Sequence, residues 1–369
     1  MKPLQLSILG IRGVPAAHGG FETFAEYLAL YLVQHGWAVT VYCQETGEHS
    51  VYETTWQGVR RIHIPVVGKG SKSTIVFDWQ ATRHAADSGQ LCLTLGYNTA
   101  VFCALLRLHG VRNVINMDGV EWRRAKWGWM ARAWFWINER AGCMLGDHLV
   151  ADHPEIAKHL ATRVSSEKIT TIAYGAPSIA EASVDEVLAR GLEPAGYLTV
   201  VARPEPENSI LEIVRGYSQK SHAFKLAVLG RFEAANPYHQ AIKSAASDGV
   251  LFLGAIYDRP VLQALRFHSL GYVHGHRVGG TNPSLVEAMG AGNPVLAHDN
   301  LFNRWVSGAG ALYFTDADSL AQTLDYLDNN PKVWSSMRAA SLNRYEEAFT
   351  WPAILAAYET LLLRFLPER

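Results

Sequence analysis

The sequence predicts an α/β protein built from two domains, each on a parallel sheet. The chain has 369 residues, more than a single hydrophobic core normally organises. It opens with an apolar run, a glycine-rich loop, a helical repeat and a second apolar run, and a similar set begins at Tyr197. The same order of strand, loop and helix in both halves indicates two similar domains rather than a short repeat.

The first half opens as a βαβ unit, the arrangement that builds parallel sheets with ligands at the strand ends. Further strands are expected at 37–43, 58–67, 90–95, 111–117 and 148–151. The opening loop departs from Gly-x-Gly-x-x-Gly, which counts against an ordinary dinucleotide-binding dehydrogenase. Its Gly19 and Gly20 either contact a phosphate or sugar through their amides or let the helix pack closely, and both interpretations stay open.

The second half follows a linker-like stretch at 174–183 and repeats the α/β order. Strands are expected at 197–202, 225–229, 250–253, 271–274 and 295–297, and a helix at 209–217. The tail, 344–366, is predicted to be helical, broken at Trp351-Pro352 and apolar enough to lie across another surface.

Composition excludes several classes of protein. Hydrophobic residues make up 49% and charged residues 18%, and the net charge of −1 argues against a surface-wide nucleic-acid footprint. The four cysteines have no metal-ligand spacing and are interpreted as buried thiols in a reducing compartment. No apolar run is long enough for a signal peptide or a membrane span, so we expect a protein that is neither secreted nor transmembrane.

The stretch 274–292 predicts a strand end, a glycine turn and a short helix whose first turn binds an anion. Thr281 and Asn282 are capping residues, Pro283 suits the first helical position, and Gly290 or Gly292 can supply a left-handed stop. Free N–H groups and the helix dipole then lie behind Gly279-Gly280. The alternative is a tight strand-to-helix turn with Glu287 as a surface residue; a polar partner such as a ribose hydroxyl explains this glutamate better.

Three more candidate residues lie just past strand ends. Asp118 is followed by glycine, Asp152 precedes Pro154 and is also a good N-cap, and Arg203 can neutralise a diphosphate or pair with a nearby glutamate. Asp316 and Asp318 resemble a metal-binding pair, but the helix after them favours capping, so no metal is assigned.

The segment 122–136 combines five tryptophans with basic residues and contains no acid. Tryptophan and basic residues on one helix are typical of an interfacial helix on anionic lipid headgroups. A core helix with snorkelling basic residues, or a platform that stacks sugars, are the other interpretations.

Several motifs together resemble the retaining, nucleotide-sugar-dependent glycosyltransferases with the GT-B fold, closest to the bacterial polysaccharide branch that includes rhamnosyltransferases. They are Gly-Gly-Phe-Glu-Thr-Phe after the first strand, Gly-Gly-Thr-Asn-Pro-Ser-Leu-Val-Glu-Ala-Met in the second half, and the segments 116–127, 203–208 and 300–303.

The resemblance implies two Rossmann-like domains facing a cleft, with a C-terminal helix crossing back to the N-terminal domain. The acceptor domain would comprise 1–172 with the returning helix 346–369, and the nucleotide-sugar domain 173–345. Donor-binding residues would be Gly19, Gly20, Arg203, Asn208, Gly280, Thr281, Asn282, Pro283, Ser284, Leu285 and Glu287.

The same resemblance gives roles to the remaining candidates. Arg203 would bind the donor diphosphate and Asp118 would position the acceptor hydroxyl, so both are assigned to catalysis. The acceptor or the membrane would contact Asp118, Glu121, Trp122, Arg123, Arg124, Lys126, Trp127, Trp129 and Asp152. Neither a metal nor a cofactor is expected, because fixed cations and helix amides can stabilise the departing diphosphate.

Two positions depart from the family pattern. The first glutamate of the usual Glu-x₇-Glu pair is Gly279 here, and the lysine that commonly follows the diphosphate arginine is Asn208. The change at Gly279 puts in doubt how the donor sugar is held. The change at Asn208 leaves Arg203 and the helix start to neutralise the phosphate charge.

The sequence therefore predicts a cytoplasmic enzyme, peripheral on the inner face of the plasma membrane. It would move a hexose, with L-rhamnose from a dTDP donor as the specific expectation, to a lipid-diphosphate-linked saccharide. Two alternatives stay open: a non-catalytic nucleotide-sugar-binding subunit, and a soluble transferase or synthase with a non-lipid acceptor.

Overall fold

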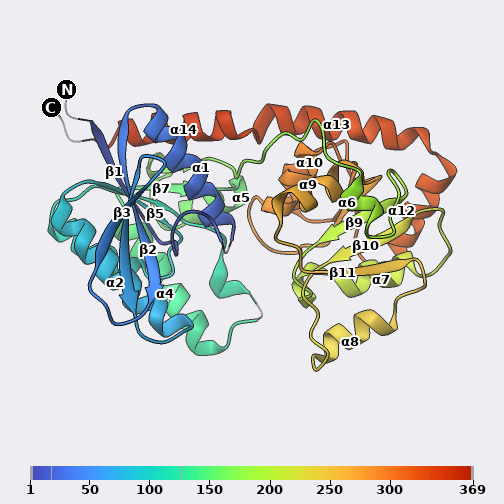
Figure 1. Cartoon of the computed structure of the whole chain (residues 1–369), viewed down its shortest axis with the longest axis horizontal. Helices are drawn as coiled ribbons and strands as arrows, with labels where there is room; N and C mark the ends of the chain where they lie inside the picture. Colours follow the sequence, from blue (N-terminus) through green and yellow to red (C-terminus); the bar gives the residue numbers. More distant parts are fainter. Residues whose placement is uncertain (1–2, 18, 125, 367–369) are drawn as a thin grey trace. The chain divides into compact units, whose positions relative to one another are not determined.

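The computed structural model describes residues 3–17, 19–124 and 126–366 (Figure 1). The chain divides into two compact units, Met1–Ala173 with Trp351–Arg369, and Tyr174–Thr350. Each unit is a parallel sheet with helices in the connections between its strands (Figure 1). The expected two-domain α/β architecture is therefore confirmed.

The first unit contains an eight-stranded sheet in the order β3-β4-β2-β1-β5-β6-β7-β8, parallel except for the β3–β4 pair. Its strands are β1 (Leu4–Leu9), β2 (Trp37–Thr46), β3 (Tyr52–Trp56), β4 (Val59–Val66), β5 (Leu91–Leu95), β6 (Asn113–Asn116), β7 (His148–Ala151) and β8 (Ile169–Thr171). Its α-helices are α1 (Gly20–Gln34), α2 (Ser71–Ser88), α3 (Cys103–Leu108), α4 (Trp129–Leu145), α5 (Pro154–Ala161) and α14 (Trp351–Leu363). Single 3₁₀ turns are η1 (Ala100–Phe102), η2 (Glu121–Arg123) and η3 (Ser166–Lys168).

The second unit contains a six-stranded parallel sheet in the order β11-β10-β9-β12-β13-β14. Its strands are β9 (Tyr197–Val201), β10 (Lys225–Leu229), β11 (Val250–Gly254), β12 (Gly271–His274), β13 (Val295–His298) and β14 (Leu312–Phe314). Its helices are α6 (Asp185–Leu188), η4 (Pro206–Asn208), α7 (Ile210–Tyr217), α8 (Pro237–Ser244), α9 (Arg259–Phe267), α10 (Pro283–Gly290), α11 (Leu301–Ser307), α12 (Ala317–Asn329) and α13 (Lys332–Ala348).

Each sheet has a switch point, where the strand order reverses. In the first unit it lies between β1 and β5, and in the second between β9 and β12. The carboxyl ends of parallel strands meet at one edge of a sheet, and loops that diverge at a switch point leave a crevice there. The fold thus marks one edge of each sheet as a binding edge.

The last helix belongs to the first unit. The carboxylate of Glu359 on α14 accepts hydrogen bonds from the Tyr31 hydroxyl and the Trp37 indole, each at 2.9 Å. The side-chain amide of Asn116 donates to the hydroxyl of Tyr358, which is buried, at 2.7 Å. The helix break expected at Trp351-Pro352 is confirmed, since α13 ends at Ala348 and α14 begins at Trp351.

Sequence reasoning missed β3, an edge strand of the first sheet. Its residues are largely exposed, so it shows no apolar run. Cross-strand pairs with β4 hold it instead: Arg60 donates to both carboxylate oxygens of Glu53, and the ring of Tyr52 stacks on His63 at 4.4 Å. Such pairs depend on register, which a single sequence does not reveal.

The four cysteines are buried free thiols, as expected. Among the helices of the described ranges, none combines the length and apolar character needed to cross a bilayer.

Candidate functional site

The loops that carry the expected donor residues leave the second sheet at its switch point. Arg203 follows β9, and the glycine loop before α10 follows β12, the neighbouring strand. The two loops are in close contact, because a Cβ on Gly275 would lie 2.2 Å from the carbonyl oxygen of Asn208. Glycine at position 275 is what allows this approach.

The start of α10 has the predicted form. Asn282 is the N-cap, and its side-chain oxygen accepts from the Ser284 N–H at 3.1 Å, while Pro283 occupies the first helical position. The Ser284 hydroxyl donates to the same Asn282 oxygen at 2.8 Å and accepts from the Tyr272 hydroxyl at 2.9 Å. No acidic residue stands in the first turn, and Gly292 takes the left-handed stop with φ 73°. This helix start keeps a positive end.

Two other residues expected at the donor are held inside the second unit. Thr281 is buried, and the Leu285 side chain is fully buried in the core. The Leu285 N–H donates to the Asn282 carbonyl at 3.1 Å. The donor role of the Gly280–Leu285 turn remains a prediction, in which Leu285 could take part through its backbone only.

Gly279 has a conformational reason to be glycine. Its φ of 136° lies where L side chains are strained, yet a Cβ there would meet no heavy atom within 4 Å. The backbone path, rather than lack of space, therefore excludes the glutamate that the family pattern places here. Glycine in place of the family's glutamate therefore goes with a loop whose backbone takes a different path at position 279.

Arg203 is held only loosely by the protein. Its guanidinium is 68% exposed and lies 3.8 Å from the carboxylate of Glu205, an exposed pair of small energetic value. The side chain of Asn208 donates to the Arg203 carbonyl at 2.8 Å and is buried. Asn208 therefore shapes the backbone of the arginine loop, and Arg203 keeps its charge available at the sheet edge.

A second arginine at this edge escaped sequence reasoning. Arg277 lies in the loop after β12, where its Nε donates to the Ser209 hydroxyl at 2.7 Å and its Nη2 to the Glu212 carboxylate at 3.0 Å. It ties this loop to the start of α7. The Arg277 side chain is still 43% exposed, but its charge is paired with the carboxylate of Glu212.

Glu287 has a partner that the sequence did not indicate. Its Oε2 lies 2.6 Å from Nη2 of Arg266, a buried arginine of α9. This ion pair gives Glu287 a protein partner in addition to the ribose hydroxyl that the sequence suggested. The pair fixes the direction of the carboxylate. Ribose recognition by Glu287 stays a prediction.

Two asparagines join the loops after β12 and β13. The amide of Asn300 donates to the His276 carbonyl at 3.0 Å, and that of Asn303 donates to the carbonyls of His276 and His298, both at 2.8 Å. The His276 ring stacks on His274 at 4.4 Å. The Asn300-x-Phe-Asn303 motif therefore acts on backbone geometry.

In the first unit, Asp118 follows β6 in a strained conformation. Its φ is 51°, and its N–H donates to the side chain of Asn116 at 3.0 Å. Burial, with a smaller contribution from the nearby Glu121, raises the pKa of Asp118 to about 6. A residue at a strand end that combines a strained backbone with a carboxyl group of raised pKa is typical of a functional site.

The segment after Asp118 is internally bonded. Glu121 accepts from the guanidinium of Arg124 at 2.6 Å and from the indole of Trp127 at 3.0 Å. The indole of Trp122 donates to Glu139 at 2.6 Å. Glu139 is buried and also receives His159 and Arg163. Hydrogen bonds to these three groups hold the pKa of Glu139 at about 2 despite the opposing effect of burial.

The outer side of α4 exposes apolar residues at helical spacing. The exposed fractions are 78% for Trp129, 68% for Met130, 43% for Trp136, 49% for Ile137 and 72% for Met144. Arg140 lies over the Trp136 ring at 3.3 Å. Trp122, Trp127 and Trp134 instead donate their indole N–H groups to the protein. Arg123 and Lys126 lie over the rings of Trp122 and Trp127; Ala125 between them is outside the described residues. The exposed apolar surface of this region therefore lies on α4.

Three other expectations concern helix starts. Gly19 is the N-cap of α1 and Gly20 its first residue, and Glu22 lies in the first turn. The expected capping alternative for Asp152 is wrong, since the N-cap of α5 is His153, whose Nδ1 accepts from the Glu155 N–H at 3.0 Å. The capping role of Asp316 is confirmed by a capping box with Ser319.

Part of the sequence matches a known protein family. Residues 4–177 match a family described as "Domain of unknown function (DUF1972)". No curated protein gives a significant match to the sequence.

Solved structures match over nearly the whole chain. Sucrose-phosphate synthase from Thermosynechococcus elongatus matches with a TM-score of 0.82 at 18% identity, covering 98% of each chain. A glycosyltransferase from Rickettsia africae gives 0.73 at 13% identity and covers 100% of each chain. Anabaena HepE in complex with UDP gives 0.75 at 13%, covering 98% of this chain and 100% of that one. The chain has the GT-B fold of glycosyltransferases, as predicted.

The raised pKa of Asp118 predicts how the stability of the first unit depends on pH. Asp118 binds its proton more tightly in the folded than in the unfolded chain, whose aspartate titrates near 3.9. The folded state is therefore favoured below about pH 4, and this advantage is lost as the pH rises to about 6. We expect Asp118→Asn to flatten the stability profile between these values and to be more stable than wild type at pH 7. Urea titrations at several pH values would measure this, and parallel profiles for the two proteins would contradict it.

Proposed function

We propose that the chain is a glycosyltransferase that transfers a hexose from a nucleoside-diphosphate sugar. The observation that carries the proposal is the acid-free start of α10 at the switch point of the second sheet, at the same sheet edge as the exposed side chain of Arg203. Helix amides and an arginine are the groups that bind a diphosphate. The likeness to HepE, whose structures contain UDP or UDP with glucose, supports the same ligand class.

The proposed reaction retains the configuration at the sugar carbon. The bond from C1 to the diphosphate oxygen breaks, the acceptor oxygen bonds to C1 on the same face, and the hydroxyl proton passes to the leaving diphosphate. Arg203 and the backbone N–H groups of Gly280, Asn282 and Ser284 stabilise the charge that develops on that diphosphate, so the proposal requires no metal. Asp118 accepts a hydrogen bond from the acceptor hydroxyl and orients it.

The proposed substrates are a dTDP-hexose, with L-rhamnose as the first sugar to test, and a saccharide linked to a lipid diphosphate. The acceptor rests on the exposed face of α4, defined by Trp129, Met130, Trp136, Ile137 and Met144. Exposed aromatic and apolar side chains beside cations favour binding at an anionic membrane surface. We therefore place the enzyme on the inner face of the plasma membrane.

A transferase or synthase with a non-lipid acceptor is the second candidate. The likeness to sucrose-phosphate synthase favours it. This candidate predicts turnover that does not depend on vesicles, and it leaves the exposed face of α4 without a role.

The donor assignment predicts a large effect at Arg203. Arg203→Ala removes the exposed cation at the switch point, so turnover of the preferred donor should fall at least about a hundredfold. Arg215→Ala, an exposed arginine on α7, is the matched control and should retain activity. The measurement is a screen of nucleotide sugars with a polyprenyl-diphosphate saccharide, with product detected by mass spectrometry. If none of the donors is turned over, or if Arg203→Ala is as active as wild type, the proposal is wrong.

The membrane assignment predicts which tryptophans matter. Trp129→Ala/Trp136→Ala removes two exposed rings of α4, and we expect the protein to float less with phosphatidylglycerol vesicles. Trp79→Ala changes a tryptophan on α2 that is as exposed as Trp136, and this variant should float like wild type. Equal flotation of the double variant, the control and wild type would remove α4 as the membrane contact.

A further inference from the structure

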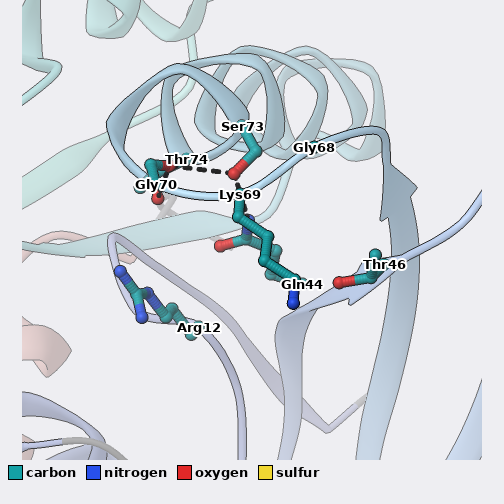
Figure 2. Close-up of a pocket in the computed structure, with 8 residues that line it drawn as sticks. All are labelled: Arg12, Gln44, Thr46, Gly68, Lys69, Gly70, Ser73 and Thr74. Carbon is teal, nitrogen blue, oxygen red and sulfur yellow. Dashed lines mark hydrogen bonds between the residues drawn. The ribbon is translucent and has the colours of Figure 1, made fainter.

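A pocket outside the donor residues opens at the carboxyl edge of the first sheet (Figure 2). Its volume is about 320 Å³, and it lies where β1, β2 and β4, three neighbouring strands, end. The lining residues are Arg12, Gln44, Thr46, Gly68, Lys69, Gly70, Ser73 and Thr74. The position is one at which α/β sheets bind ligands.

The pocket carries positive charge that no acid in its lining neutralises, and in the part of the chain that the structure describes Arg12 interacts electrostatically only with Asp78, which lies outside that lining. Arg12 and Lys69 come from different loops, and Figure 2 shows both side chains among the residues that surround the pocket. Within the described residues neither side chain forms an ion pair or hydrogen bond, and no aspartate or glutamate lines the pocket. The side-chain Oε1 of Gln44 is buried there without a hydrogen-bond partner. This oxygen only accepts hydrogen bonds, so a hydroxyl group of a ligand, and not an ionised phosphate oxygen, would satisfy it.

The first turn of α2 adds to this charge. Helix starts favour acidic residues, yet the first turn of this 18-residue helix has none and instead carries Lys72, one turn past Lys69. At the start of α1, by contrast, Glu22 supplies an acid. Like charges at the positive end of a helix are unfavourable unless an anion joins them.

The backbone leaves room for such an anion. Gly68 and Gly70 have φ values of 88° and 84°, and a Cβ at either would meet no heavy atom within 4 Å. The hydroxyls of Ser73 and Thr74 now donate to the Gly70 carbonyl and line the same turn (Figure 2). Open glycines, two hydroxyls and two cations form the kind of surface that holds phosphate oxygens.

We infer that this pocket binds a phosphate group, as a phosphomonoester or a diphosphate. Arg12 and Lys69 pair with the phosphate oxygens, and the first turn of α2 donates backbone N–H groups to them. Binding of the anion rests on the pocket alone. Assigning the anion to the acceptor, as its diphosphate or as a sugar phosphate, rests on the proposed function.

The test is a calorimetric titration of the full chain with inorganic pyrophosphate, in the presence of saturating dTDP to occupy the donor residues. We expect Arg12→Ala/Lys69→Ala to bind pyrophosphate about tenfold more weakly than wild type. Arg83→Ala, an exposed arginine further along α2, is the matched control and should bind like wild type. Lys69→Ala alone should show a smaller loss, and it serves if the double variant folds poorly.

Equal affinities for wild type and both pocket variants, or no binding by wild type, would overturn the inference. The same variants should bind dTDP normally, so this result is separate from failure of the proposed function, which would appear as absence of turnover with every donor. Competition then distinguishes the sources of the phosphate. Farnesyl diphosphate displaces pyrophosphate if the pocket serves a lipid-linked acceptor, and glucose 6-phosphate does so if it serves a soluble one.

Discussion

The parallel pairing of β9 with β12 is the constraint on which the second unit depends. It is short, joining Gly271 to Leu198 and Tyr272 to Thr199, but it brings two loops from distant parts of the sequence to one edge. The loops approach closely because Gly275 has no Cβ, and the Asn208 carbonyl occupies the space that a Cβ would need. Arg203 and the start of α10 then present their positive charge at the same switch point.

The same constraint explains the departures from the family pattern. Asn208 holds the backbone of the Arg203 loop through a hydrogen bond, a role that does not require a lysine's charge. Gly279 takes a φ that a glutamate would not adopt without strain. Arg277, bonded to Ser209 and paired with Glu212, fixes the loop after β12 against the start of α7. Asn208, Gly279 and Arg277 thus shape the edge, while the exposed Arg203 carries its positive charge.

Local signals in the sequence predicted most of the strands, the start of α10 and the helix break before Pro352, because capping residues and apolar periodicity act over a few residues. The short strands β3, β8 and β14 were not predicted. The sequence could not indicate partners that are distant along the chain. The Arg266–Glu287 pair joins α9 to α10, and the bond between Trp122 and Glu139 depends on how η2 meets α4. The Arg12 and Lys69 pocket was missed for the same reason: its cations come from loops 57 positions apart, which meet only because β1, β2 and β4 are neighbours.

The proposed function depends on binding of a nucleoside diphosphate at the switch point of the second sheet. Such binding can be followed by amide and guanidinium NMR shifts of the isotope-labelled chain during titration with UDP or dTDP. We expect the largest changes on the N–H groups of Gly280, Asn282 and Ser284 and on the Nε–H of Arg203. Changes confined to other loops, with these groups unmoved at saturation, would contradict it.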